Sequence, residues 1–471
     1  MVLSGSMSDS DNSIWESDES LTSDCDSENS STYTKRLLDM DELVEGELQS
    51  SRSSIETITP IIFTATTMDN KRPHGGSTFG RRTIVRDRRR RHNLIVRDYF
   101  RGEDSKYPPQ HFRRRFRMDI SLFIRILHDI TNYDKYFTQR YDAVKREGLS
   151  PLQKMIAAVR MLAYGLPADI LDEYIQIGES TAVECLKRFC DAIIGIYEKE
   201  YLRKPNENDI ARLLKEAEIR GFPGMIGSLD CMHWHWENCP TAWHGTHTNG
   251  FKRVPTLILE TVASQNLWIW HAFFGMAGTN NDINVLDRSP LFDDIINGVA
   301  PPCEFAIQGK KYNMGYYMSD GIYPKYATLI QTISNPSNDR EELFSKRQEA
   351  VRKDVERAFG VLQSRWRIVK GPARNWKEKD LGKIMKTCII LHNMIIENEE
   401  PQGIDPERWE PHVEERVRLV NLEHDHRFLV CRMMYRMKQV RSTEAHDTLK
   451  TDLINHLWDT HTNQSNVSTR N

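Results

Sequence analysis

Side chains that could do chemistry are concentrated between residues 229 and 247, in the segment LDCMHWHWENCPTAWHGTH. This segment contains two cysteines, four histidines and three tryptophans around a single aspartate, Asp230. Cysteine and histidine are common zinc ligands, but zinc needs them at the close spacing of a tight turn. Cys231 and Cys239 are too far apart for such a turn, and no second cysteine pair follows. We therefore interpret the histidines and tryptophans as residues that pack at the edge of a sheet.

A second zinc hypothesis concerns His235 and Glu237, which match the His-x-Glu half of the zinc deaminase signature. The other half of that signature is a Pro-Cys-x-x-Cys motif. Pro302 and Cys303 supply its beginning, but no second cysteine follows at the required position. The incomplete signature argues against a zinc-dependent nucleobase enzyme.

Three acidic residues stand out because each lies beside an apolar segment. Asp230 follows the strand-like run MIGSL, and Asp320 follows the run YYMS. Glu356 lies next to Val355 and Phe359, which belong to the apolar stripe of a helix. A carboxylate in such a place is costly unless it is paired or binds a cation. Hard carboxylate oxygens suit Mg²⁺, and a pair of divalent cations can promote phosphodiester hydrolysis. The sequence predicts that these three acids are catalytic residues and metal ligands.

Two further acids and several cations surround these three in the sequence. Asp354 is two residues from Glu356 and faces across the helix, so we expect it to be a solvated surface acid. Asp282 is a candidate auxiliary ligand, although we favour the interpretation that it caps the helix beginning at NVLDRS. Six cations are interpreted either as phosphate contacts or as exposed helix charges: Lys252, Arg253, Arg352, Arg357, Arg365 and Arg367.

The first elements that must position these residues are helical. From residue 118 to 200 apolar residues recur at helical spacing, and Pro151 is expected to open one of the helices. Gly178 interrupts the pattern, and Thr181 with Glu184 forms a capping-box pattern before the next helix. Two helices joined by a glycine-containing turn resemble a helix-turn-helix, although plain helical packing explains the same pattern.

The pattern changes from helical to strand-like after Gly221. The runs MIGSLDCMHW, TLILETVAS and LWIWHAFFG predict consecutive strands, and YYMSDGIY predicts another. Helices are expected over 341–369 and 380–396, and two more in RFLVCRMMYRMKQ and DTLKTDLINHLW. This order predicts an α/β or α+β domain preceded by a helical one.

Four phrases, in chain order, carry a resemblance to a known family: GSLDCMHW, GTNNDINVLDRSPLF, YYMSDGIYP and VERAFGVLQSRWRI. They are similar to the DDE transposases of the PIF/Harbinger superfamily, especially the plant Pong-like group, over roughly residues 90–460. The resemblance implies an RNase H-like catalytic fold with Asp230 on the first strand, Asp320 on the fourth and Glu356 on the following helix. It also implies two Mg²⁺ or Mn²⁺ ions bound by these acids.

The same resemblance implies a function. A transposase of this kind cleaves DNA at terminal inverted repeats and transfers the strand into a short A/T-rich target. It also implies a Myb/SANT-like protein encoded by the same element as partner, and a homo-oligomer in the synaptic complex. The alternative is a transposase-derived nuclear protein that binds DNA or chromatin without catalysis. The presence of all three acids argues against this alternative.

Charge is distributed unevenly along the chain. Residues 1–50 carry 13 acidic residues against Lys35 and Arg36, whereas the remainder holds 62 basic and 54 acidic residues. A basic body with an acidic tail indicates an anionic partner, with nucleic acid as the first expectation. The basic stretches RRTIVRDRRRRH and RRRFR are interpreted as nuclear localisation signals or phosphate contacts, although a solvated basic face or a flexible arm explains the same pattern. The expected DNA contacts are Arg88, Arg89, Arg90, Arg91, Lys187, Arg188, Lys252 and Arg357.

These patterns divide the chain into four expected parts. They are a disordered acidic tail over 1–78, a basic arm with a helix-turn-helix-like region over 79–205, an RNase H-like nuclease domain over 206–400, and a helical C-terminal extension over 401–471. No segment is long and apolar enough to span a bilayer. We expect a nuclear protein in a reducing compartment. The stretch VRLVNL leaves export to the cytoplasm open, although a packed helix is the simpler interpretation.

Overall fold

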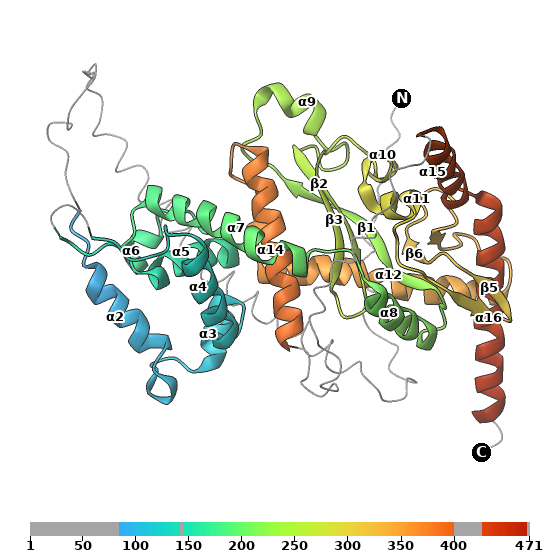
Figure 1. The fold of residues 1–471 in the computed structure, drawn as a ribbon, viewed down its shortest axis with the longest axis horizontal. Coiled ribbons are helices and arrows are strands. Elements are labelled where there is room, and N and C mark those ends of the chain that lie inside the picture. The colour runs from blue at the N-terminus through green and yellow to red at the C-terminus, as the bar shows by residue number, and fades with distance from the viewer. Residues whose placement is uncertain (1–83, 142–144, 400–425, 469–471) are drawn as a thin grey trace, which may run out of the picture. The chain divides into compact units, whose positions relative to one another are not determined.

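The computed structural model describes residues 84–141, 145–399 and 426–468 (Figure 1). The predicted disordered tail over 1–78 and the stretch VRLVNL lie outside the described residues. Two kinds of structure make up the described part, a helical region and a mixed sheet with helices on both faces. This confirms the predicted α/β class with a preceding helical region.

The helical region contains the helices expected between residues 118 and 200, together with two basic helices before them, α2 and α3. Helix α7 packs against α4, α5 and the later helix α14, so it forms the centre of this region. The bounds of the helices are α2 (Arg88–Tyr99), α3 (Pro109–Phe116), α4 (Ile120–Tyr133), α5 (Pro151–Tyr164), α6 (Leu171–Ile175), α7 (Glu179–Tyr201) and α8 (Glu207–Ile219), with a 3-10 turn η1 (Gly102–Asp104).

One helix of this region begins where the sequence predicts, and the cap predicted for another helix is absent. Pro151 opens α5 as predicted, and Ser150 and Gln153 form a capping box there. The capping box predicted at Thr181 is wrong, because α7 begins at Glu179 after Gly178 and has no side-chain cap. Helix α6 is five residues long, so the first helix of the expected helix-turn-helix is little more than one turn.

The sheet confirms the strands predicted after Gly221. Its five strands lie in the order β3-β2-β1-β6-β7, with β1, β2 and β3 antiparallel and β6 and β7 parallel to β1 (Figure 1). A separate two-stranded sheet is formed by β4 and β5. The bounds are β1 (Met225–His235), β2 (Thr256–Ala263), β3 (Ile269–Ala277), β4 (Phe305–Ile307), β5 (Lys310–Tyr312), β6 (Tyr316–Ser319) and β7 (Leu329–Gln331).

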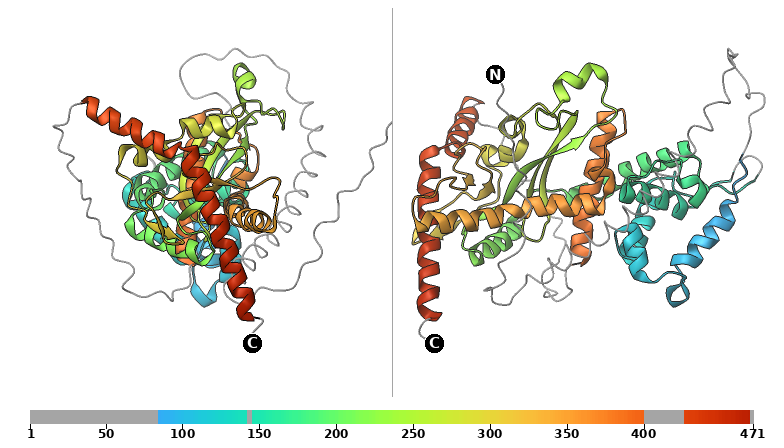
Figure 2. Two further views of the ribbon diagram at one scale, coloured as in Figure 1. Left: turned by 90° about the vertical axis from the view of Figure 1, so that its right-hand side faces the viewer. Right: turned by 180° about the vertical axis from the view of Figure 1, so that it is seen from behind.

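Helices cover both faces of the sheet. The long helix α12 crosses one face (Figure 2), where Met318 of β6 packs with Phe344 and Val351 of the helix. On the other face, Leu229 and Val262 pack against the short helices that follow β3. The remaining elements are η2 (Thr241–Trp243), α9 (His244–His247), α10 (Asp282–Arg288), η3 (Pro290–Phe292), α11 (Asp293–Asn297), α12 (Asp339–Arg365), α13 (Arg367–Lys370), α14 (Glu378–Glu399), α15 (His426–Val440) and α16 (Thr443–Ser468).

Helix α14 joins the helical region to the sheet. Its segment CIILHNMII is buried along its whole length, which confirms the predicted core helix. The fully buried amide of Asn393 accepts a hydrogen bond from the backbone N–H of Ile269 at 2.9 Å, and donates to the carbonyls of Tyr201 at 2.7 Å and Ile269 at 2.8 Å. One side chain therefore connects α14, α7 and β3. Among the described helices, none is long and apolar enough to cross a bilayer.

The substitution Asn393→Ala should lower the free energy of unfolding by about 2–4 kcal/mol, because it leaves buried backbone groups without partners. Chemical denaturation monitored by circular dichroism measures this change. The matched control is Asn398→Ala on the same helix, since the Asn398 amide is exposed and, within the described residues, donates one hydrogen bond, to Asp119 at 3.3 Å. Equal effects of the two substitutions would contradict the role assigned to Asn393.

Candidate active site

Two of the three predicted acids come from neighbouring parallel strands. The register of β1 and β6 pairs Ser228 with Met318. Continued by two residues, the same register places Asp230 opposite Asp320. Because side chains alternate along a strand, the Asp230 carboxylate lies on the same sheet face as Ser228, which bonds to α12. Asp320 is exposed in the turn directly after β6, and its carboxylate accepts a hydrogen bond from the backbone N–H of Gly321.

The Asp230 carboxylate is mostly removed from water, since its side chain is 19% exposed. Its pKa is raised to about 6, chiefly by burial and to a smaller extent by the negative charges of Asp282 and Glu356. The hydrogen bond from the backbone N–H of Cys231, at 2.8 Å, and the charge of Arg352 act in the opposite direction. The site thus concentrates negative charge where water solvates it poorly.

Glu356 reaches this site from the middle of α12. The Arg352 guanidinium donates to the Glu356 carboxylate at 2.6 Å, one helical turn away, and lies 4.0 Å from the Asp230 carboxylate. One arginine therefore links the first and third predicted acids. The sequence placed Arg352 among six cations without singling it out, and its position between the acids could not be read from helical periodicity.

Two buried polar side chains fix α12 against the sheet. The Ser228 hydroxyl donates to the carbonyl of Val351 at 3.0 Å, two residues before Asp230 on β1. The Gln348 amide donates to the carbonyls of Ser319 at 3.1 Å and Ile330 at 2.9 Å, next to Asp320. The sequence analysis missed both residues. A signal for Gln348 exists, because it is a polar residue on the apolar stripe of α12.

Asp282 differs from its expected role. The residue that caps α10 is Asn281, whose side chain accepts the backbone N–H of Asn284 at 2.9 Å, so the predicted cap at Asp282 is wrong. Asp282 instead lies beside the thiol of Cys231. Burial raises its pKa, as does the charge of Asp320. A fourth carboxylate is therefore in electrostatic reach of Asp230 and Asp320, which fits the auxiliary role considered from the sequence.

The prediction that Asp354 is a solvated surface acid is wrong. Its side chain is buried, and it forms ion pairs with Arg220, the residue after α8, and with Arg357. The acid is structural and joins α12 to the end of α8. Arg365 and Arg367 are also buried rather than exposed helix charges, and Arg365 bonds to the carbonyl of His392 and to Glu399.

The histidines and tryptophans of the opening segment make packing contacts, as predicted. His233 hydrogen-bonds to the hydroxyl of Thr256 at 2.9 Å, and His247 stacks on Trp243. The indole N–H of Trp234 donates to a backbone carbonyl, as does that of Trp236. These side chains therefore hold the loop after β1 against the segment that follows α13.

The side chains predicted to contact DNA differ in whether they are ion-paired within the protein. Lys187 and Arg188 on α7 are ion-paired, with Asp380 and with Glu184 respectively. Arg357 forms an ion pair with Asp354, whereas Lys252 is exposed. The pKa of the nearby His233 imidazole is lowered, chiefly by burial and also by the charge of Lys252. The outer face of α7 therefore offers fewer unpaired cations than its sequence suggests. Contact between these residues and DNA stays a prediction.

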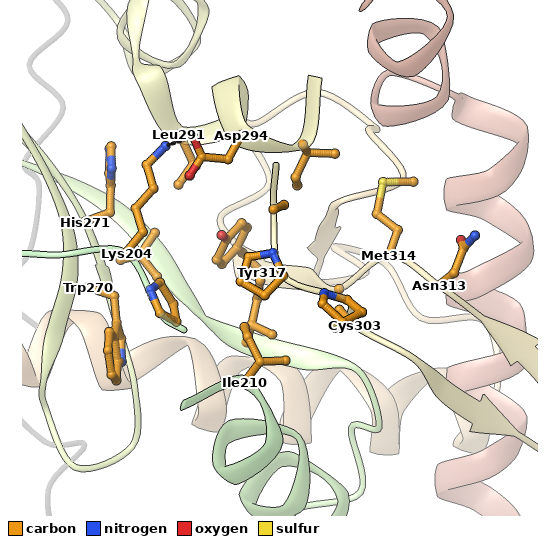
Figure 3. A pocket seen from close by; sticks show the side chains of 18 of the residues that line it. Lys204, Ile210, Trp270, His271, Leu291, Asp294, Cys303, Asn313, Met314 and Tyr317 are labelled. Carbon is orange, nitrogen blue, oxygen red and sulfur yellow. Dashed lines mark ion pairs between the residues drawn. The ribbon is translucent and has the colours of Figure 1, made fainter. Parts of the chain in front are cut away.

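A cavity of about 300 Å³ lies on the sheet face opposite α12 (Figure 3). Its lining includes Trp270, His271 and Tyr317, and an ion pair between Lys204 and Asp294 at 2.8 Å crosses it. None of the three predicted catalytic acids lines it. The cavity is thus separate from the three acids.

The acids can be tested against the metal that the sequence implies. Within the described residues, no three His, Cys, Asp or Glu side chains are gathered closely enough to form a ready metal site. The donor chemistry nevertheless fits a hard divalent cation, since the groups are carboxylates and the pKa of Asp230 is raised to about 6 by burial and neighbouring negative charge. Of the three acids, Glu356 is the least available to bind a cation, because its carboxylate is ion-paired with Arg352.

Comparison with protein families gives two matches. Residues 199–402 match the family described as plant transposon protein, which spans β1 to β7 and helices α8 to α14. Residues 92–131 match a domain of unknown function, which covers most of α2 together with α3 and α4. The transposon protein match contains all three predicted acids.

Comparison with individual proteins agrees with the first match. The chain is 24% identical over 262 residues to Protein ALP1-like of Arabidopsis thaliana, covering 54% of this chain and 62% of the relative. It is 25% identical to Antagonist of Like Heterochromatin Protein 1 of the same plant, covering 62% and 74%, and 20% identical to the candidate nuclease HARBI1 of Bos taurus, covering 54% and 70%. The first match thus spans under two thirds of that relative's own length.

No solved structure matches this chain. The family evidence rests on the domain match and on three relatives that belong to the same superfamily. By these matches residues 199–402 form a plant transposon protein domain, and the chain is similar to Harbinger-derived transposases.

Proposed function

We propose that this chain is a metal-dependent DNA nuclease and strand transferase that acts on the ends of a transposable element. The observation that carries the proposal is the link between two acids on separate elements, beside the strand that leads to the third. Asp230 lies on β1, and Asp320 comes directly after β6, the parallel neighbour of β1. Arg352 links Asp230 to Glu356 on α12. Such an arrangement suits the binding of divalent cations and phosphate.

The strand order supports an RNase H-like fold. Three antiparallel strands come first, and the fourth strand in the sheet, β6, joins the first in parallel on its free side. Asp230 then lies on the first strand and Asp320 directly after the fourth, as the resemblance implies. Helix α12 follows the fifth strand and carries Glu356. The match to the plant transposon protein family covers all of these elements.

The proposed chemistry assigns a role to each acid. Two Mg²⁺ or Mn²⁺ ions, when bound, would lower the pKa of the attacking water and offset charge on the leaving 3′ oxygen. Asp230 and Asp320 would bind from the sheet, and Glu356 would bind after its carboxylate leaves Arg352. The freed guanidinium of Arg352 would then be available to a phosphate of the substrate.

The proposed reaction has two steps. Hydrolysis breaks a P–O3′ bond at a terminal inverted repeat, and the water oxygen stays on phosphorus while a 3′ hydroxyl is released. That hydroxyl then attacks a phosphodiester of an A/T-rich target and displaces another 3′ oxygen. A Myb/SANT-like protein, a homo-oligomeric synaptic complex and a nuclear location belong to the same proposal.

A second candidate function is DNA or chromatin binding without catalysis. One relative is named for antagonism of Like Heterochromatin Protein 1, so a protein of this family carries a chromatin-related name. The ion pair between Arg352 and Glu356 favours this candidate as well, because it occupies a carboxylate that catalysis would need. The two candidates differ in whether DNA ends are cut.

Replacement of each acid should abolish cutting. The changes Asp230→Asn, Asp320→Asn and Glu356→Gln should each lower the rate of strand nicking at a terminal repeat by at least about 100-fold, because each removes a ligand charge. The assay is excision of a terminal-repeat element in cells supplied with the Myb-like partner, together with nicking of a plasmid in Mg²⁺ or Mn²⁺.

The matched control for these substitutions is Glu342→Gln, an exposed acid in the first turn of the same helix. It should excise like the parent. If the parent binds DNA but never cuts it, the non-catalytic function replaces the nuclease. Retained cutting in all three acid variants would refute the residue assignment.

The raised pKa of Asp230 predicts a pH-dependent gain in stability when its charge is removed. The folded-state pKa of Asp230, about 6, exceeds the ordinary value of 3.8, so the fold binds this proton more tightly than the unfolded chain does. The protonated carboxyl therefore stabilises the fold at low pH, and this stabilisation is lost as pH rises through about 6. Without metal, Asp230→Asn should raise the free energy of unfolding by about 1–3 kcal/mol at about pH 7.5 and by little at about pH 4.

Denaturation in the presence of a chelator, at both pH values, measures this difference. The exposed Asp104 provides a control substitution, Asp104→Asn, which should change stability little at either pH. A destabilised Asp230→Asn protein at neutral pH would show that the Asp230 charge is well paired in the fold and does not await a cation.

A further inference from the structure

The arginines of α2 face two different directions. On the inner side, Arg88 donates to the carbonyl of Glu147 at 3.2 Å and Arg91 donates to the carbonyl of Glu173 at 3.2 Å. Arg86, just before the helix, forms a bidentate ion pair with Asp172. These residues attach α2 to the neighbouring elements, so their charges are committed within the fold.

The outer side of α2 forms a shallow groove. Its lining residues share one face of the helix and the turn after it: Asp87, Arg89, Arg90, Asn93, Leu94, Arg97 and Arg101. The side chains of Arg89, Arg90 and Arg101 make no hydrogen bond or ion pair within the described chain, and Arg97 pairs only with the adjacent Asp98, at 3.0 Å. The groove thus has four cations against one lining carboxylate.

The second basic stretch, RRRFR, does not provide a comparable surface. Arg113 is paired with Glu399. Arg115 lies 4.1 Å from the ring centre of Tyr107, and Arg117 is buried. Three of its four arginines therefore stabilise the fold. The sequence treated both stretches alike, and only the structure separates them.

We propose that the outer groove of α2 binds the phosphate backbone of duplex DNA. The inference rests on the proposed function, since DNA is the substrate there, and it names the surface that holds this substrate outside the catalytic acids. Charge complementarity identifies the ligand. Unpaired guanidinium groups with several N–H donors each match phosphate oxygens, and one amide, Asn93, adds a neutral donor between them.

The spacing of the groove suits a strand of repeating charges. Residues 89 and 97 are two helical turns apart, or about 12 Å along the helix axis. Each DNA strand carries one phosphate per about 3.4 Å of duplex axis, so the groove spans several phosphates. Contacts of this kind position a protein on DNA without reading its sequence. The inference gives a ligand to part of the segment that matches a domain of unknown function.

The test compares two double variants with a matched control in the full-length protein, in the presence of a chelator so that no DNA is cut. The groove variants are Arg89→Gln with Arg90→Gln, and Arg97→Gln with Arg101→Gln. The control, Lys199→Gln with Lys215→Gln, removes the same charge from exposed lysines of α7 and α8. Fluorescence anisotropy with a short duplex measures affinity between about 50 and 200 mM salt.

Each groove variant should bind about tenfold more weakly, and the slope of log affinity against log salt should fall by about 2, since two phosphate contacts are lost. Both effects should be the same for unrelated duplex sequences. The control should keep the parental slope. Thermal unfolding should match the parent for all variants, because the substituted side chains are exposed.

Three outcomes would overturn the proposal. Groove variants that keep the parental slope would remove this surface from the DNA interface while leaving the proposed cutting intact. A parent that binds no duplex would refute both the groove and the proposed function. Unchanged duplex binding combined with lost binding of a labelled peptide of residues 1–50, which carry 13 acidic residues, would identify an acidic polypeptide as the ligand instead.

Discussion

The arrangement of the candidate active site depends on the attachment of α12 to the sheet through buried polar side chains. Glu356 can reach Asp230 only if the helix has one rotation and one position along its axis. Gln348 sets both, because its amide bonds to the carbonyls of two strands, about 12 Å along the helix from Glu356. Apolar contacts alone tolerate sliding, whereas a misplaced buried amide loses its hydrogen bonds at a cost of about 1–3 kcal/mol.

This attachment brings together charges that repel one another. Asp230 is poorly solvated and lies within electrostatic reach of Asp282 and Glu356. Arg352 offsets part of this charge, since it contacts both Asp230 and Glu356. The pKa of Asp230 nevertheless stays raised, so the arginine is an incomplete counter-ion. A site whose negative charge exceeds its positive charge is destabilising for the fold and favourable for binding cations.

The sequence predicted the elements of this fold well because their signals are local. Alternation, helical spacing and glycine punctuation identified β1, β2, β3, α12 and α14. The acids were found because each borders an apolar run. The largest error concerns a partner far away in sequence, and the others concern single helix caps. Asp354 was taken for a surface residue because its partner Arg220 lies 134 residues earlier, and no periodicity predicts such a pairing. The helix cap was assigned to Asp282, although Asn281, one position earlier, can also accept a hydrogen bond from a backbone N–H of the first turn and does so in the structure.

The arginine run of α2 shows why composition alone cannot assign a binding surface. Consecutive residues on a helix are turned by about 100°, so four adjacent arginines must point in different directions. Arg88 and Arg91 point inward and bond to backbone carbonyls, whereas Arg89 and Arg90 point to solvent. The two sets depend on each other. Inward bonds fix the helix, and a fixed helix presents its outward arginines at defined spacing, so that less backbone freedom is lost on binding.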